Sequence, residues 1–171
     1  MKLHIGCKGP KIEGFTRVDV TQWGDVDIVT DAQDLNMIKD GEADEIYVSH
    51  ILEHFSHRKT LDVLREWGRV LKKGGIAYLS VPDFDRLVDL YLASGRMLGQ
   101  FIQDWNHGGQ NYEKDVHQRS FTFPVLAGLM SQAGFSRIER LDYLPYNLGD
   151  CSTLTDNFQN KPISVNVKGI K

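Results

Sequence analysis

Short apolar runs alternate with polar turns through the first half of the chain. Each run is bounded by glycine, proline or acidic residues, a pattern typical of β-strands. Five strands are predicted in this half, at residues 2–7 (KLHIGC), 16–20 (TRVDV), 27–31 (DIVTD), 45–49 (EIYVS) and 76–81 (IAYLSV). Two later runs, at residues 137–143 and 163–168, predict a sixth and a seventh strand.

Apolar residues recur at a helical spacing between the fourth and fifth predicted strands. Leu64, Trp67 and Leu71 mark one side of a helix over residues 56–71. Two lysines follow and suit the negative end of the helix dipole. The glycine pair at residues 74–75 is expected to stop this helix.

Two more helical segments are predicted in the second half. Residues 84–106 have a helical pattern with a break near Ser94, and residues 123–133 form a helix that Gly134 ends. Residues 107–119 between them are polar and predict a loop. Strands that alternate with helices favour an α/β fold with a mostly parallel sheet, and such sheets bind ligands at the carboxyl ends of their strands.

The first three predicted strands are joined by unusually short connections. Only residues 8–15 separate the first two strands, and only residues 21–26 the next two. A βαβ crossover ordinarily needs about 10–12 residues or more, so the early crossover helices are expected to be truncated or absent. A dinucleotide site requires a helix N-terminus aimed at the pyrophosphate. The short connection therefore favours a cofactor without phosphate.

Composition and charge narrow the class of protein. The chain has 171 residues, of which 41% are hydrophobic and 25% charged, as expected for a soluble globular protein with one domain. A formal net charge of −3 gives no general attraction to nucleic acid or to an anionic membrane. No apolar run approaches the roughly 20 residues that span a bilayer, and two cysteines make no disulfide framework. We therefore expect a cytoplasmic location.

Five motifs follow one another in a recognisable order: IGCKG, EGFTRVDV, TDAQDL, YVSHILEHF and RVLKKGGIAYLSVPD. In order and spacing they resemble the class I S-adenosylmethionine-dependent methyltransferases, closest to a small bacterial branch of the type 11 kind. The resemblance is close over residues 2–92 and weaker over residues 117–143. It implies a Rossmann-like, doubly wound, seven-stranded and mostly parallel sheet with the last strand antiparallel, in a single domain of residues 1–171.

The resemblance also implies a methyl transfer from S-adenosyl-L-methionine to a small-molecule or saccharide acceptor. Gly6 and Cys7 match the turn where the backbone leaves room for the methionine part of the cofactor. Asp19 matches the acid that accepts hydrogen bonds from the two ribose hydroxyls, a task that suits an acceptor-only carboxylate. Each has a simpler alternative, because Gly6 could merely turn the chain and Asp19 could be a turn former at a strand end.

The adenine and methyl ends of the cofactor are matched by later residues. Asp31 and Ala32 correspond to the pair that binds adenine, through an acid at its amino group and a backbone N–H at the ring. As an alternative, Asp31 could cap a short helix that starts at Ala32. Ser49 and His50 match the end of the fourth strand, which faces the sulfonium and its methyl group.

Two residues depart from the family's pattern. His4 stands where the family usually has an acid, and Lys8 stands in place of the second motif glycine. The side chain of Lys8 could crowd the pocket, or its ammonium could pair with the carboxylate of the cofactor. The rival hypothesis is therefore a non-catalytic binding module of the same fold, with a cofactor pocket that Lys8 impairs.

The sequence His50-Ile51-Leu52-Glu53-His54 fits H-x-x-E-H, a zinc signature that places both histidines on one helix face. His50 directly follows a predicted strand, so this helical arrangement is not expected and no metal site is predicted. His50 is instead a candidate general base, or a wall of the transfer site. Glu53 and His54 are expected to shape the loop, and His57 to be solvated.

The polar loop of residues 107–119 lies near the strand ends, where an acceptor would enter. Gln110 and His117 are its candidate substrate residues, since polar loops on a scaffold often carry specificity. The missing early helices leave part of one sheet face uncovered. We expect either residues 144–162 or a second subunit, in a homodimer, to pack there.

Overall fold

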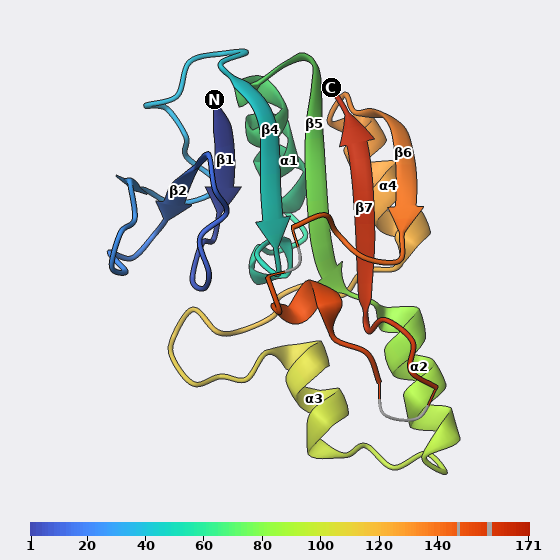
Figure 1. Ribbon diagram of the computed structural model, residues 1–171. Helices are drawn as coiled ribbons and strands as arrows, with labels where there is room; N and C mark the ends of the chain where they lie inside the picture. The colour runs from blue at the N-terminus through green and yellow to red at the C-terminus, as the bar shows by residue number, and fades with distance from the viewer. Residues whose placement is uncertain (147, 157–158) are drawn as a thin grey trace.

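A seven-stranded sheet organises the chain, in the order β3-β2-β1-β4-β5-β7-β6 (Figure 1). The computed structural model describes residues 1–146, 148–156 and 159–171. The five strands from β3 to β5 are parallel, and β7 is antiparallel to both β5 and β6, as predicted. The strands are β1 Lys2–Ile5, β2 Phe15–Asp19, β3 Ile28–Val29, β4 Ala43–Ser49, β5 Leu71–Pro82, β6 Ser136–Leu141 and β7 Ser164–Ile170.

Within the described residues, four α-helices and two 3-10 turns accompany the sheet. Residues 94–99 separate α2 from α3, which confirms the break predicted near Ser94. Figure 1 shows α2 and α3 beyond the carboxyl ends of the central strands. No helix in the described part of the chain is long and apolar enough to cross a membrane. The helices are α1 Thr60–Val70, α2 Phe84–Ala93, α3 Gln100–His107 and α4 Phe123–Gln132, and the turns are η1 Leu52–His54 and η2 Cys151–Thr153.

The first helix ends within one residue of the prediction, but it begins at Thr60 rather than at residue 56, and the strand after it begins at Leu71 rather than at residue 76. The helix stops at Val70, and Leu71 is already extended, with φ −74° and ψ 135°. Leu71 pairs with Ala43 of β4, so the sheet takes over this residue before the glycines are reached. Gly74, with φ +82°, turns the chain within the same stretch. Pairing with β4 therefore starts the strand ahead of the glycine pair, while the end of the helix agrees with the prediction to within one residue.

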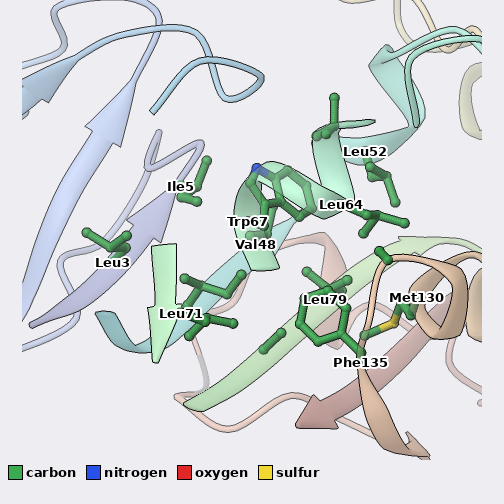
Figure 2. Packing of buried hydrophobic residues seen from close by; sticks show 14 of the residues in the cluster. Leu3, Ile5, Val48, Leu52, Leu64, Trp67, Leu71, Leu79, Met130 and Phe135 are labelled. Atoms are coloured by element: carbon green, nitrogen blue, oxygen red, sulfur yellow. The ribbon is translucent and has the colours of Figure 1, made fainter. Parts of the chain in front are cut away.

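One face of the sheet carries the main apolar core. Leu64 and Trp67 of α1 and Met130 of α4 are fully buried against inward side chains of the central strands (Figure 2). Alternate strand residues such as Val48 and Leu79 supply the other half of this layer. Burial of so much apolar surface makes this face the chief source of stability.

The opposite face is covered by the chain that follows β6. Leu144 is buried there, with Tyr146 and Leu148 packed around it, against Phe15 of β2 and Tyr47 of β4. The prediction that part of residues 144–162 covers this face is confirmed for these side chains. Residues 147, 157 and 158 of the segment lie outside the described residues.

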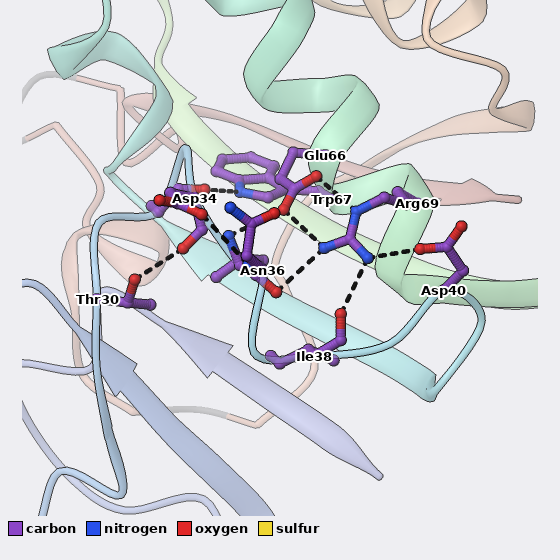
Figure 3. A network of polar contacts seen from close by, with 10 residues as sticks. Thr30, Asp34, Asn36, Ile38, Asp40, Glu66, Trp67 and Arg69 are labelled. Carbon is purple, nitrogen blue, oxygen red and sulfur yellow. Dashed lines mark hydrogen bonds and ion pairs between the residues drawn. The ribbon is translucent and has the colours of Figure 1, made fainter.

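The segment between β3 and β4 forms no helix and is tied to α1 by polar contacts (Figure 3). Arg69 donates to the carbonyl oxygens of Ile38 (2.9 Å) and Leu35 (3.1 Å) and pairs with Asp40. Glu66 accepts from the backbone N–H of Leu35 at 2.9 Å. In a crossover helix, backbone N–H and C=O groups would bond to one another. Here the side chains of Glu66 and Arg69 bond to those of Leu35 and Ile38 instead.

Candidate functional site

A cavity of about 1110 Å³ opens at the carboxyl ends of β1, β2 and β4, the edge at which a parallel sheet binds ligands. Most of the site residues predicted from sequence line it. They are Gly6, Lys8, Asp19, Asp31, Ala32, Ser49, His50 and His117. The structure thus gathers side chains from five separate segments around one space.

Two predicted site residues do not line this cavity. Cys7 is fully buried and is not among the residues that line it. Gln110 is exposed, with φ +54°, and lies outside the lining. The cofactor role of Cys7 and the substrate role of Gln110 therefore stay predictions.

Gly6 turns the chain where β1 ends. Its φ is +74°, and its N–H donates to the carbonyl of Val18 at 2.9 Å. A Cβ atom at this position would collide with the side chain of Ile51. The glycine is therefore required by the turn and by Ile51, which itself lines the cavity.

Arg17 holds the connection that replaces the first crossover helix. Its side chain is buried, pairs with Asp25, and donates from Nη2 to the carbonyl oxygens of Cys7 and of Gly9, the latter at 3.0 Å. A guanidinium offers five donors, so one side chain can satisfy several carbonyls of a short loop. Sequence reasoning missed this residue. A basic residue inside the apolar strand run TRVDV was the available signal.

Asp19 ends β2 at the wall of the cavity. Its Oδ1 accepts from the N–H of Thr21 (2.9 Å) and from Nε1 of Trp23 (3.2 Å). The N–H of Thr30 donates to its backbone carbonyl at 2.9 Å. Its Oδ2 accepts no hydrogen bond from the described residues. One oxygen thus fixes the carboxylate, and the other is available to a ligand.

Asp31 and Ala32 follow β3 and are held by neighbouring elements. Asp31 Oδ1 accepts from the N–H of Gln33 at 3.1 Å. The carbonyl of Ala32 accepts from Nε1 of Trp67 at 2.8 Å, so the main core positions this part of the wall. The alternative of a helix starting at Ala32 is wrong, because residues 32–37 form turns.

Lys8 lies between two aromatic side chains of the cavity wall. Its Nζ is 5.0 Å from the ring centroid of Trp23 and 5.5 Å from that of Tyr112. Such cation–π contacts attract an ammonium group to the ring faces. They join the loop after β1 to the loop of residues 107–119 across the cavity.

His4 lies next to Arg17 on the face opposite the main core. It is 3% exposed, and its Nδ1 is buried without a hydrogen-bond partner among the described residues. Burial, reinforced by the charge of Arg17, lowers the pKa of His4 to about 4. The imidazole is therefore neutral near pH 7. A neutral ring avoids repulsion from the buried guanidinium of Arg17.

His50 adopts a left-handed backbone conformation, φ +55°, immediately after β4. Its Nε2 lies 2.9 Å from Oγ of Ser164, and its Nδ1 lies 3.0 Å from Oε1 of Glu53. The ring also packs edge-on against Trp105, with ring centroids 5.4 Å apart. Both ring nitrogens thus have protein partners, which leaves neither one directed at a substrate.

His117 enters the cavity wall from the distant polar loop. Its Nδ1 lies 3.0 Å from the carbonyl oxygen of Trp105. The adjacent Gln118 donates from its N–H to the carbonyl of Glu53 at 2.8 Å and from its side chain to that of His54 at 2.8 Å. Residues 107–119 are therefore fastened to the turn η1 that follows β4.

The family model described as a methyltransferase domain matches residues 15–79. A SAM-dependent methyltransferase from Archaeoglobus fulgidus has a similar structure, with a TM-score of 0.63 and 15% identity over 99% of this chain and 85% of that one. A 1,6-didemethyltoxoflavin-N1-methyltransferase from Burkholderia thailandensis, solved with S-adenosylhomocysteine, has a TM-score of 0.60 and 15% identity over 99% of this chain and 70% of that one. No curated protein sequence matches significantly.

The chain has the class I methyltransferase fold. A third methyltransferase, from Methanosarcina mazei, gives a TM-score of 0.61 at 18% identity and covers 99% of this chain and 91% of that one. Two features of this methyltransferase fold were not predicted from sequence: the support of the first loop by Arg17, and the approach of His117 to η1. Arg17 is hidden within the pattern of a strand, and His117 is distant from η1 along the chain.

Proposed function

We propose that the chain is an S-adenosylmethionine-dependent methyltransferase that binds its cofactor in the cavity at the carboxyl ends of β1, β2 and β4. One observation carries this proposal. The residues that the family resemblance assigns to the cofactor come from separate segments and, apart from Cys7, line one cavity.

The donor set fits the cofactor in its chemical character. Asp19 presents a carboxylate oxygen that accepts no hydrogen bond from the described residues, which suits the two hydroxyls of a ribose. Asp31 and Ala32 lie on the same wall and would hold the adenine. Gly6 and Ser49 would border the methionine part. When bound, the cofactor supplies a methyl group on a positively charged sulfur.

The chain's own part in methyl transfer is to position the reactants and exclude water. His50 has both ring nitrogens engaged, so we assign it to the wall of the site and to the positioning of Glu53 rather than to proton abstraction. Residues 109 and 111–118 line one side of the cavity, and we place the small-molecule or saccharide acceptor there.

Calorimetry with S-adenosylmethionine and S-adenosylhomocysteine tests the proposal. We expect the wild-type chain to bind both compounds and Asp19→Asn to bind them at least about 10-fold more weakly, because a hydrogen bond to a charged group contributes about 1.5–3 kcal/mol. Asp62→Asn is the matched control, since Asp62 is exposed on α1 and makes the same change of charge far from the cavity. The absence of binding in the wild type would overturn the proposal in favour of a non-catalytic module.

A further inference from the structure

Glu53 is a carboxylate buried among three histidines. It lies on η1 and is fully buried; its Oε1 is paired with Nδ1 of His50, and its Oε2 has no hydrogen-bond partner among the described residues. His50 Nδ1 and His117 Nε2 approach Oε1 at 3.0 and 3.9 Å. A buried carboxylate without good hydrogen bonds is costly unless it is paired or coordinates a metal ion. The structure therefore leaves this group with unused ligand capacity.

His54 and His117 are held in the same tautomer by backbone carbonyls. Nδ1 of His54 lies 3.1 Å from the carbonyl oxygen of Val116, and Nδ1 of His117 lies 3.0 Å from that of Trp105. A carbonyl oxygen only accepts, so both Nδ1 atoms carry the proton and both Nε2 atoms are left with a lone pair. Metal-ligating histidines are typically oriented by such a bond from the second ring nitrogen.

These three side chains converge. One ligand atom from each of Glu53, His54 and His117 lies within 4.8 Å of the other two. Ligand atoms about 2.0–2.2 Å from a common ion lie roughly 3–4 Å apart, so small side-chain rotations would complete a coordination site. His54 and His117 line the large cavity, whereas Glu53 lies behind it. Any remaining coordination positions would face the cavity.

We propose that Glu53, His54 and His117 form a binding site for a divalent transition-metal ion beside the cavity. Two imidazoles and one carboxylate suit ions such as Zn²⁺, Mn²⁺, Fe²⁺ or Co²⁺. His50 does not belong to this set, because its Nε2 contacts Ser164 and its Nδ1 contacts Glu53. It acts as the outer partner that orients the ligand carboxylate.

This arrangement differs from the helical zinc signature considered for the same residues. That signature would use His50 and His54 on one helix face, whereas His50 here follows a strand and η1 is a single 3-10 turn. The second imidazole comes instead from His117, delivered by the loop of residues 107–119. Of the three residues of the motif, Glu53 and His54 belong to the proposed site, and the distant His117 completes the set.

The site also indicates a class of acceptor, and this step rests on the proposed function. An ion held at the cavity wall favours acceptors that offer it an oxygen ligand, such as a hydroxyl or carboxylate group, rather than wholly apolar molecules. The ion would hold that oxygen in place within the cavity, a positioning role consistent with catalysis by orientation.

Titration of the metal-free full-length chain with Co²⁺, followed by visible absorption, tests the site. We expect one Co²⁺ per chain and a rise in Tm on binding. His54→Gln and His117→Gln should each weaken binding at least about 10-fold, and Glu53→Gln should do the same if it folds. His57→Gln, an exposed histidine of the same region, should bind as the wild type does. Absence of binding in the wild type, or equal binding by His54→Gln, would overturn the proposal.

The outcome can be separated from that of the proposed function. S-adenosylhomocysteine binding is measured on metal-free protein, and Co²⁺ binding is measured without the cofactor. A chain that binds the cofactor but no Co²⁺ would remove the metal site and leave the methyltransferase proposal intact. A chain that binds Co²⁺ but no cofactor would overturn the methyltransferase proposal and leave the metal site intact.

Discussion

The strands on the two sides of the sheet are joined in different ways. From β4 to β7, helices α1 and α4 cover one face and bury Trp67 and Met130 in the main core. From β1 to β3, short loops replace helices and are held by polar side chains, chiefly Arg17 and Asp19. The helical half supplies most of the buried apolar surface. The loop half leaves the strand ends open, and the cavity forms there.

The largest effect is expected in the helical half. Trp67 is fully buried on α1, and its Nε1 bonds to the carbonyl of Ala32. Trp67→Ala should lower the free energy of unfolding by about 3–5 kcal/mol, because it leaves a large cavity and an unpaired carbonyl. Urea unfolding measures this change.

Trp23→Ala is the matched control for this comparison. Trp23 is 40% exposed and lies at the cavity wall. We expect a loss of at most about 1 kcal/mol in the free energy of unfolding, since little buried surface is removed. Equal losses for Trp67→Ala and Trp23→Ala would contradict the assignment of stability to the helical half.

A smaller effect depends on pH and on His4 in the loop half. The pKa of His4 is about 4 in the folded chain, against an ordinary value of 6.5. Between these values the unfolded chain takes up a proton that the folded chain does not. Stability is therefore lost as the pH falls from about 6.5 toward 4, by about 2 kcal/mol between pH 7 and pH 4.5.

Urea midpoints at pH 7 and pH 4.5 measure this loss. His4→Phe keeps the packing against Tyr47 and should make the difference between the two pH values smaller. His57→Gln, which changes an exposed histidine, should leave the difference unchanged. The same pH dependence in His4→Phe and in the wild type would show that His4 is not its source.

Arg17→Met is expected to lower the free energy of unfolding less than Trp67→Ala does. It removes donors from the carbonyls of Cys7 and Gly9, while Asp25 is exposed enough to be solvated, so we expect a loss of about 1–2 kcal/mol. The affinity for S-adenosylhomocysteine should fall as well, because the loop after β1 lies at the cavity. Unfolding and calorimetry measure the two effects.

Arg65→Met is the control for Arg17→Met. Arg65 forms an exposed pair with Asp62 on α1, and such pairs contribute at most about 1 kcal/mol. Both its stability and its cofactor affinity should match those of the wild type. An unchanged affinity in Arg17→Met would show that the loop does not depend on its polar support.

Much of the fold could be predicted from the sequence because strand and helix patterns are local. The seven strands, the break between α2 and α3 and the short early connections all follow from spacing within a few residues. The early start of β5 was not predicted, since Leu71 pairs with Ala43 ahead of the glycine pair. The burial of Cys7 outside the cavity lining was not predicted either, because it depends on the backbone conformation at the turn.

In the candidate site, too, some residues could be predicted from local patterns and others depend on tertiary contacts. Gly6, Asp19, Asp31 and Ser49 stand at or just beyond strand ends, and strand ends are readable from the sequence. Their convergence on one cavity follows from a parallel sheet, whose carboxyl ends share an edge. The side-chain partners of Lys8 and His50 could not be predicted in this way, because they come from other segments of the chain.

The sequence by itself determined the order of strands and helices, the missing early crossovers and the residues placed at the strand ends, because periodicity and turn chemistry act over short distances. Only the tertiary structure decided that Arg17 supports the first loop, that both nitrogens of His50 are engaged, and that His117 meets Glu53 and His54. Those contacts join segments far apart in the chain, and their distances depend on the packing of the whole fold.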